Sequence, residues 1–391
     1  MRSGVSANMR PVHGDDVKLT IDLNLQRAAS EVINKPDQTD DARFQDDAWF
    51  KTPTGAICLI TPGGEVLAAA SAPNVDGRAA IPHRDGQGAY AYERTLRRHT
   101  GLPIGSVFKP FAALWCLEKG LVTAEQGLLC VPRAREGRMV AGYHSVNCHR
   151  SIGHGELVLA DALRVSCNAY FAQLGGRIGD MEGLMDCART FGFDLPTGVN
   201  DMAAGRGLRE DYRNPSFHAK SSFSSSDLER GANGLTVLEG TPLQVARAFA
   251  GLATGALPRV SFVADERAEP SVPLPIGRHH LSSVREALID VAQNGSARLL
   301  RDLDVAVKTG SADYLPMSDA VAAQLHFPAG SQPASRKHTW VAGWSPAESP
   351  RVIFVVYLHD VGITSSHSAV FVARQLLERP EVQSYLLEAG Q

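Results

Sequence analysis

The sequence lacks a transmembrane helix, a signal peptide and a basic block, which are features of membrane-spanning, secreted and nucleic-acid-binding proteins. It has no uninterrupted run of roughly 18 apolar residues, so no transmembrane helix is evident. Its first residues, MRSGVSANMRPVHGDD, carry no apolar core of the kind found in a signal peptide. With a formal net charge of −3 and no block of lysine and arginine, it shows no surface for nucleic acid or membrane. We expect the chain as written to be soluble, with residues 1–17 as a polar leader or the remnant of an N-terminal region.

Cysteine is sparse, and its spacing matches no common metal site. There is no Cys-x-x-Cys pair and no paired histidine spacing beside the cysteines, so the sequence predicts no metal ligands. Cys130 and Cys148 flank a loop rich in glycine and arginine, and whether they pair in an oxidising compartment stays open. A solvated or structural role is favoured over metal binding for His144, His149 and His154 in the same region. The six cysteines are Cys58, Cys116, Cys130, Cys148, Cys167 and Cys187.

What the sequence does contain is a large apolar fraction, with strands near both ends and helices between. Of 391 residues, 44% are hydrophobic and 21% are charged, which is typical of a globular protein. Two apolar runs around Pro-Gly-Gly, 56–61 and 65–72, predict a β-hairpin. Strand-like runs return at 305–312, 338–346 and 351–360, whereas helical spacing dominates most of 105–293. This order favours an α+β fold in which both chain ends close the α/β part around an inserted helical region.

Four more segments have a clear local signal. Asp22 predicts the N-cap of a helix from about Leu23, and residues 368–378 predict an amphipathic helix. The serine-rich residues 221–227 predict a mobile loop. The polar residues 313–337 form a connection so long that it is typical of a functional or disordered loop.

Ser106 and Lys109 are the first candidates for chemistry. On a helix their side chains face the same side, about 5–6 Å apart at Cβ. A serine hydroxyl needs a base to remove its proton, and a lysine serves only if burial or a nearby cation lowers its pKa. Phe108, Phe111 and Trp115 would supply an apolar surround, and the free N–H of Ser106 would be half of an oxyanion hole. Taken alone, Ser-x-x-Lys arises by chance, and an N-cap serine is the ordinary alternative.

Ser166 and Asn168 lie in the helical pattern of residues 156–179. The functional interpretation makes Ser166 a proton relay and Asn168 a hydrogen-bond partner for substrate or for Lys109. The ordinary alternative is a polar helical turn that packs against its neighbours.

Lys308, Thr309, Gly310 and Ser311 end the first late strand. A cation, a hydroxyl and a glycine there suit the docking of a substrate carboxylate and amide, because Gly310 lets a substrate backbone approach closely. The N–H of Ser311 would be the second oxyanion donor. The alternative is a strand end that turns at glycine.

The three motifs occur in the order Ser-x-x-Lys, Ser-x-Asn, Lys-Thr-Gly, a set shared by β-lactamases and penicillin-binding proteins. Over roughly residues 18–380 the chain resembles the transpeptidase domain of class B penicillin-binding proteins. The resemblance rests on six segments in order: LTIDLNLQRAA, GAICLITPGGEVLAAASAP, LPIGSVFKPFAALWCLEKG, HGELVLADALRVSCNAYFAQLG, GTPLQVARAFAGLATG and VKTGSA. It departs from the family at GANGLTVLEG, where a Gly-Gln-Gly is usual, and at Ser311, where threonine is commoner.

The resemblance implies an antiparallel five-stranded sheet flanked by helices. It divides residues 18–391 into an α/β subdomain, about 18–95 and 258–391, and a helical subdomain, about 96–257. It also implies an extracytoplasmic location, with the membrane anchor not part of this chain.

The implied reaction is peptidoglycan crosslinking by acyl transfer. Ser106 would attack the penultimate carbonyl of a stem peptide ending in D-Ala-D-Ala, and an amine of a second stem peptide would accept the acyl group. Lys109 would be the base, Ser166 would pass the proton to the leaving amine with Asn168 and Lys308 beside it, and the substrate would bind at Thr309, Gly310 and Ser311. No cofactor or metal is implied. β-Lactams would acylate Ser106, and a membrane glycosyltransferase is a candidate partner.

Two alternatives remain. A serine β-lactamase or a β-lactam sensor of the same fold would share the chemistry through acylation and differ in deacylation. A non-catalytic scaffold of the wall-synthesis machinery would keep the fold without the reaction. The elongation, division or sporulation role and the acceptor amine are not fixed by these motifs.

Overall fold

The computed structural model describes residues 16–35, 54–72, 95, 103–132, 146–199, 210, 212–214, 217–218, 222–264, 270–313, 337–361 and 368–388. Residues 1–15, His144 and most of the predicted loop at 313–337 lie outside these ranges.

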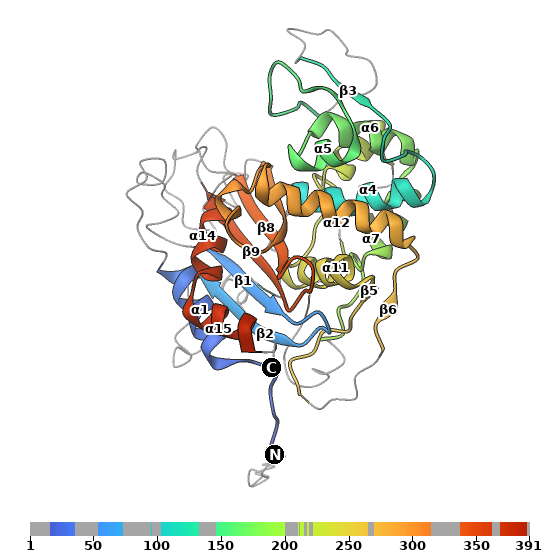
Figure 1. Ribbon diagram of the computed structural model, residues 1–391. Coiled ribbons are helices and arrows are strands. Elements are labelled where there is room, and N and C mark those ends of the chain that lie inside the picture. The colour runs from blue at the N-terminus through green and yellow to red at the C-terminus, as the bar shows by residue number, and fades with distance from the viewer. Residues whose placement is uncertain are drawn as a thin grey trace, which may run out of the picture.

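A five-stranded antiparallel sheet is built from both ends of the chain, as predicted. Its order is β2–β1–β9–β8–β7, so the early hairpin pairs through β1 with the last strand (Figure 1). The strands are β1 (Gly55–Ile60), β2 (Val66–Ala72), β7 (Ala306–Asp313), β8 (Lys337–Ser345) and β9 (Val352–Val361).

Helices cover both faces of this sheet, which is why the central strand β1 is apolar along its whole length. Every residue of β1 is buried, so neither of its faces meets solvent. One face carries α1 (Leu23–Asn34), α14 (Ser368–Leu377) and α15 (Pro380–Glu388), and the other packs on α11 (Pro242–Thr254) and α12 (Arg278–Gln293) (Figure 1). Asp22 caps α1 as predicted, accepting from the N–H groups of Asn24 and Leu25.

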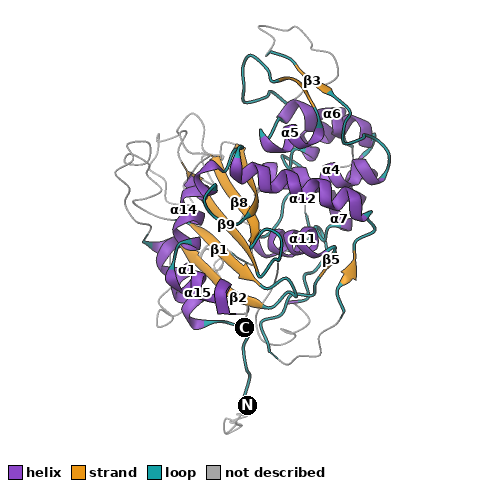
Figure 2. Ribbon diagram, viewed as in Figure 1, coloured by secondary structure: helices purple, strands orange, loops and turns teal. Residues whose placement is uncertain are grey.

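A helical region lies beside the sheet, and α12 runs between the two parts (Figure 2). Its elements are η1 (Gly105–Phe108), α4 (Lys109–Glu118), α5 (Leu159–Arg164), α6 (Asn168–Ile178), α7 (Met181–Thr190) and α10 (Ser225–Ala232), with a small sheet of β3 (Leu128–Cys130) and β4 (Gly155–Leu157). Two further short strands, β5 (Ala256–Leu257) and β6 (Val272–Pro273), follow α11, and a 3₁₀ turn, η2 (Arg298–Leu300), follows α12.

The prediction of a mobile serine-rich loop was wrong over residues 225–227, which form the first turn of α10. Ser224 is the N-cap of α10, and its hydroxyl and the Asp227 carboxylate form a reciprocal capping box. A serine followed three residues later by an acid is a helix-start signal, and it outweighs serine content.

None of the helices in the described ranges combines the length and the apolar character needed to cross a bilayer.

The start of α11 offers a test of local stability. Thr241 is fully buried, and it forms a capping box with Gln244. Thr241→Val keeps the shape and removes the hydroxyl, so we expect the free energy of unfolding to fall by about 1–2 kcal/mol in urea titrations. Thr241→Ser keeps the hydroxyl, and it should lose less. Equal losses from both variants would contradict this assignment.

Candidate active site

The first motif begins on a tight turn that packs against the third motif. Gly105 opens η1 with φ of +61°, and a Cβ there would lie 2.7 Å from the carbonyl oxygen of Ser311. Only glycine permits this approach. Residues three apart eclipse in a 3₁₀ turn, so Ser106 and Lys109 face the same side. Ser106 is half-buried and Lys109 is fully buried, which puts the hydroxyl at the surface of the site and the amine beneath it.

The second motif lies at a break between two helices. The helical pattern of 156–179 predicted a continuous helix, and this was wrong, because α5 ends at Arg164 and α6 begins at Asn168. Between them Ser166 has φ of +54°, a left-handed conformation that costs a non-glycine residue about 1–2 kcal/mol. The break turns Ser166 and Asn168 toward Lys109.

The hydrogen bonds of Lys109 account for a neutral amine. Its Nζ lies 2.8 Å from the carbonyl oxygen of Ser166 and 2.7 Å from Oδ1 of Asn168. Both partners only accept, so they take the two hydrogens of an uncharged amine. A third, longer contact of 3.3 Å reaches the Ser166 hydroxyl. The remaining position on nitrogen is therefore a lone pair or a third proton, which is what a general base exchanges.

Lys308 reaches the same serine from the sheet. Its Nζ donates to the Ser166 hydroxyl at 2.9 Å and to the Thr309 carbonyl at 3.0 Å. Like Lys109, it has no exposed surface. The structure thus brings Lys109, Ser166, Asn168 and Lys308 together from three separate parts of the chain.

Burial sets the charge of these amines. It lowers the pKa of Lys109 from 10.5 to about 7, against an opposing effect of the nearby Cys167 and Cys148. Burial, helped by the charge on Lys109, also holds the pKa of Lys308 well below its ordinary value. Two amines that share one hydroxyl disfavour each other's charge. Lys109 is therefore a usable base near neutral pH.

The third motif is the edge strand β7. Thr309 is almost buried, and its hydroxyl lies 2.5 Å from that of Ser296. A Cβ on Gly310 would lie 3.0 Å from both the Ile104 carbonyl oxygen and Val107, so this glycine lets β7 lie close to the segment that carries Ser106. Ser311 is half-buried at the strand end.

Sequence reasoning missed three residues that support the site. The Asn168 amide donates to the Asn147 carbonyl, and Asn233 donates to the Asn168 carbonyl. The Gly234 carbonyl accepts from the N–H of Gly105 at 2.8 Å. Gly234 belongs to the GANG segment that departs from the usual family pattern, and that departure was the one available signal.

The aromatic surround of Lys109 differs from the prediction. Phe171 of α6 supplies the ring, 5.4 Å from Nζ. Phe108 and Phe111 point the other way and pack against Phe193, with ring centroids 5.7 and 5.4 Å from it. They stabilise the core beneath the turn.

The matches to known proteins agree with this arrangement. A family model described as the penicillin binding protein transpeptidase domain matches residues 55–378. The chain belongs to this family. The peptidoglycan D,D-transpeptidase MrdA of Acinetobacter baumannii is 27% identical over 378 residues, which cover 88% of this chain and 51% of that protein. The stage V sporulation protein D of Bacillus subtilis is 24% identical, covering 77% of this chain and 45% of that one. The chain spans about half the length of these curated relatives.

Solved structures share the fold of the transpeptidase family. PBP2 of Pseudomonas aeruginosa, in complex with WCK 5153, has a TM-score of 0.69 and 22% identity, covering 95% of this chain and 77% of that one. PBP2 of Helicobacter pylori in complex with MreC has a TM-score of 0.69 and 21% identity, covering 96% and 64%.

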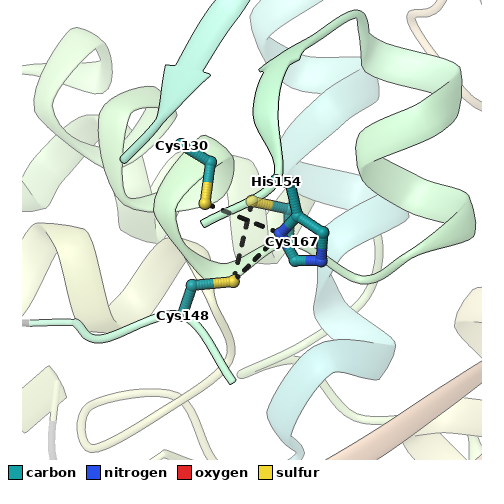
Figure 3. Close-up of side chains that lie close together, drawn as sticks. All are labelled: Cys130, Cys148, His154 and Cys167. Carbon is teal, nitrogen blue, oxygen red and sulfur yellow. Dashed lines mark hydrogen bonds between the residues drawn. The ribbon is translucent and has the colours of Figure 1, made fainter. Parts of the chain in front are cut away.

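A cluster of thiols and an imidazole lies directly behind the second motif. Cys130, Cys148, His154 and Cys167 point toward one another, and their ligand atoms all lie within 4.8 Å (Figure 3). The three cysteines are buried, and each of the six cysteines is a thiol rather than half of a disulfide. Cys130 comes from β3, Cys148 and His154 come from the segment before β4, and Cys167 lies between Ser166 and Asn168. The cluster therefore has no short Cys-x-x-Cys spacing by which the sequence could have predicted it.

The spacing of these atoms suits a metal ion with tetrahedral coordination. The Cys148 sulfur lies 3.9 Å from that of Cys167 and 3.3 Å from Nδ1 of His154, and the Cys130 sulfur lies 3.5 Å from the same nitrogen. Metal–ligand bonds of about 2.0–2.3 Å give tetrahedron edges of roughly 3.3–3.8 Å. Four protein ligands leave no open position, which is typical of a structural rather than a catalytic zinc site. These residues could therefore hold Zn²⁺, although the sequence alone predicted no metal ligands.

Metal content tests this capacity. We expect protein purified without chelators to carry about one Zn²⁺ per chain by elemental mass spectrometry, since a closed Cys₃His set binds zinc strongly. Cys148→Ser should lose the ion, whereas Cys187→Ser, which changes a buried thiol of α7 outside the cluster, should retain it. Zinc-free wild type after dialysis against excess Zn²⁺, or equal zinc in Cys148→Ser, would count against the site.

Proposed function

We propose that this chain is the catalytic part of a peptidoglycan D,D-transpeptidase that works through an acyl-enzyme on Ser106. The observation that carries the proposal is the buried amine of Lys109, one turn from Ser106, with both N–H groups of its neutral form accepted by Ser166 and Asn168. This leaves the amine one function, which is to accept the Ser106 proton.

The reaction starts when the Ser106 hydroxyl attacks the penultimate carbonyl of a stem peptide ending in D-Ala-D-Ala, and its proton passes to Lys109. The N–H groups of Ser106 and Ser311 stabilise the developing oxyanion. The C–N bond then breaks, and Ser166 delivers a proton to the departing D-Ala amine. Lys109, through its contact with Ser166, replaces that proton. An amine of a second stem peptide attacks the ester and completes the crosslink.

The third motif binds the donor peptide. Thr309 and Ser311 hold the terminal carboxylate, and the donor peptide lies along β7. Lys308 donates a hydrogen bond to the Ser166 hydroxyl oxygen, which favours the departure of a proton from that hydroxyl. No step needs an organic cofactor.

The substrate places the enzyme on the outer face of the cell membrane. β-Lactams are its covalent inhibitors, because they acylate Ser106 and leave no amine that diffuses away. A membrane glycosyltransferase supplies the glycan strands; one solved structure with this fold describes a peptidoglycan synthase complex that coordinates polymerization and crosslinking.

Intact-mass measurement after penicillin G tests the nucleophile. Wild type should gain one adduct per chain, and Ser106→Ala should gain none. An adduct that persists for many minutes favours the transpeptidase. Rapid, repeated hydrolysis of nitrocefin would favour a β-lactamase, and an unlabelled wild type would favour a non-catalytic scaffold.

The acylation rate should depend on pH through Lys109. The base acts when neutral, and the neutral fraction grows as pH rises through its pKa of about 7. We expect the second-order rate of acylation to rise about tenfold per pH unit below pH 6 and to level off above pH 8. Lys109→Arg stays protonated throughout this range and should lower the rate by a factor of about 10²–10⁴. A flat profile for wild type would exclude Lys109 as the base.

A further inference from the structure

A turn after α12 contacts both the strand of the Lys-Thr-Gly motif and the helix end that precedes the Ser-x-Asn motif, and it belongs to neither motif. Residues 294–297 follow the end of α12 at Gln293 and precede η2. In this turn the Ser296 hydroxyl lies 2.5 Å from the Thr309 hydroxyl, and the Ser296 N–H donates to the Arg164 carbonyl at 3.3 Å. Arg164 is two residues before Ser166. One residue therefore contacts the strand that carries Thr309 and the helix end that leads to Ser166.

The packing around the turn leaves it little freedom. A Cβ on Gly295 would lie 2.4 Å from the Arg164 carbonyl oxygen and 2.8 Å from the Val291 Cα, so the backbone of the turn lies directly against α5 and α12. Asp290 accepts from the Arg164 guanidinium at 3.1 Å and from the Asn294 amide. These contacts hold Ser296 at a fixed place beside Thr309.

The direction of the Ser296–Thr309 hydrogen bond follows from what Thr309 binds. A hydroxyl has one hydrogen to donate, and an ionised carboxylate only accepts. If Thr309 holds the carboxylate of the donor peptide, its hydroxyl donates its one hydrogen to that carboxylate. Ser296 must then be the donor in the 2.5 Å contact, and it leaves the Thr309 hydrogen directed at the substrate.

We propose that Ser296 is a positioning residue, which orients the Thr309 hydroxyl for the substrate carboxylate and fixes β7 relative to the Ser166 turn. This rests on the proposed function, since it needs Thr309 to bind a carboxylate. In this role Ser296 acts through Thr309.

Acylation by paired probes tests the proposal. Penicillin G carries a carboxylate, and its methyl ester does not. For Ser296→Ala we expect the second-order rate of acylation by penicillin G to fall about three- to tenfold, the effect of one hydrogen bond, while the rate with the methyl ester stays within twofold. Ser296→Thr keeps the hydroxyl and should restore most of the rate. Ser283→Ala is the matched control, because it removes a hydroxyl of the preceding helix, α12, that donates to the His279 carbonyl.

A double-mutant cycle separates orientation from general damage. If Ser296 acts through Thr309, the Ser296→Ala change should add nothing in a Thr309→Val background. Equal losses with both probes, or a full additional loss in that background, would overturn the role of Ser296 while leaving Ser106 acylation in place. Absence of any adduct on wild type would overturn the proposed function, and the assignment of Ser296 with it.

Discussion

Two buried amines, on Lys109 and Lys308, converge on the single hydroxyl of Ser166, and the rest of the structure makes this arrangement tolerable. Each amine would lose several kcal/mol of hydration if it stayed charged in the interior. The protein responds in two ways. Burial lowers both pKa values, and the charge on Lys109 lowers that of Lys308 further. Each nitrogen also has a backbone carbonyl as an acceptor, and Lys109 has the Asn168 side chain as well. Lys109 is a usable base because burial penalises its charged form, and not because a neighbouring cation repels its proton.

This constraint explains why the site is assembled from three places. Lys109 must be buried beneath a helix, so it follows a turn whose packing is apolar: Phe108 and Phe111 lie in an aromatic cluster with Phe193. Lys308 must approach from the sheet. The turn that carries Lys109 and the strand that carries Lys308 can lie together because Gly105, which has no side chain, packs closely against β7 and Gly234. A side chain on Gly105 would push the turn that carries Ser106 away from β7, the strand that carries Lys308 and Ser311.

The sequence predicted most of the architecture and several neighbours in the site, and the misses share a cause. The sheet, its hairpin and the α1 cap follow from local patterns, because alternation and capping are set by adjacent residues. The break at Ser166 was missed because a left-handed residue between two helical patterns leaves the spacing of apolar residues almost intact. The Cys130, Cys148, His154 and Cys167 cluster was missed because its members become neighbours only after three segments pack together. The contact of Ser296 with Thr309 was missed for the same reason, because the two residues belong to different elements.

The strain at Ser166 shows how these later findings belong together. A left-handed serine persists only if its surroundings determine it from both sides. On the N-terminal side, the Arg164 carbonyl is held by the N–H of Ser296. On the C-terminal side, Cys167 is buried in the thiol–imidazole cluster, and the Asn168 amide is held by Asn147. Ser166 must keep its oxygen within reach of two amines whose nitrogens are themselves fixed, so a shift of even 1 Å would exchange a shared hydrogen bond for an unpaired buried amine. The contacts of Arg164 on one side and of Cys167 and Asn168 on the other therefore hold Ser166 in place. They fix where the Ser166 hydroxyl lies relative to the amines of Lys109 and Lys308.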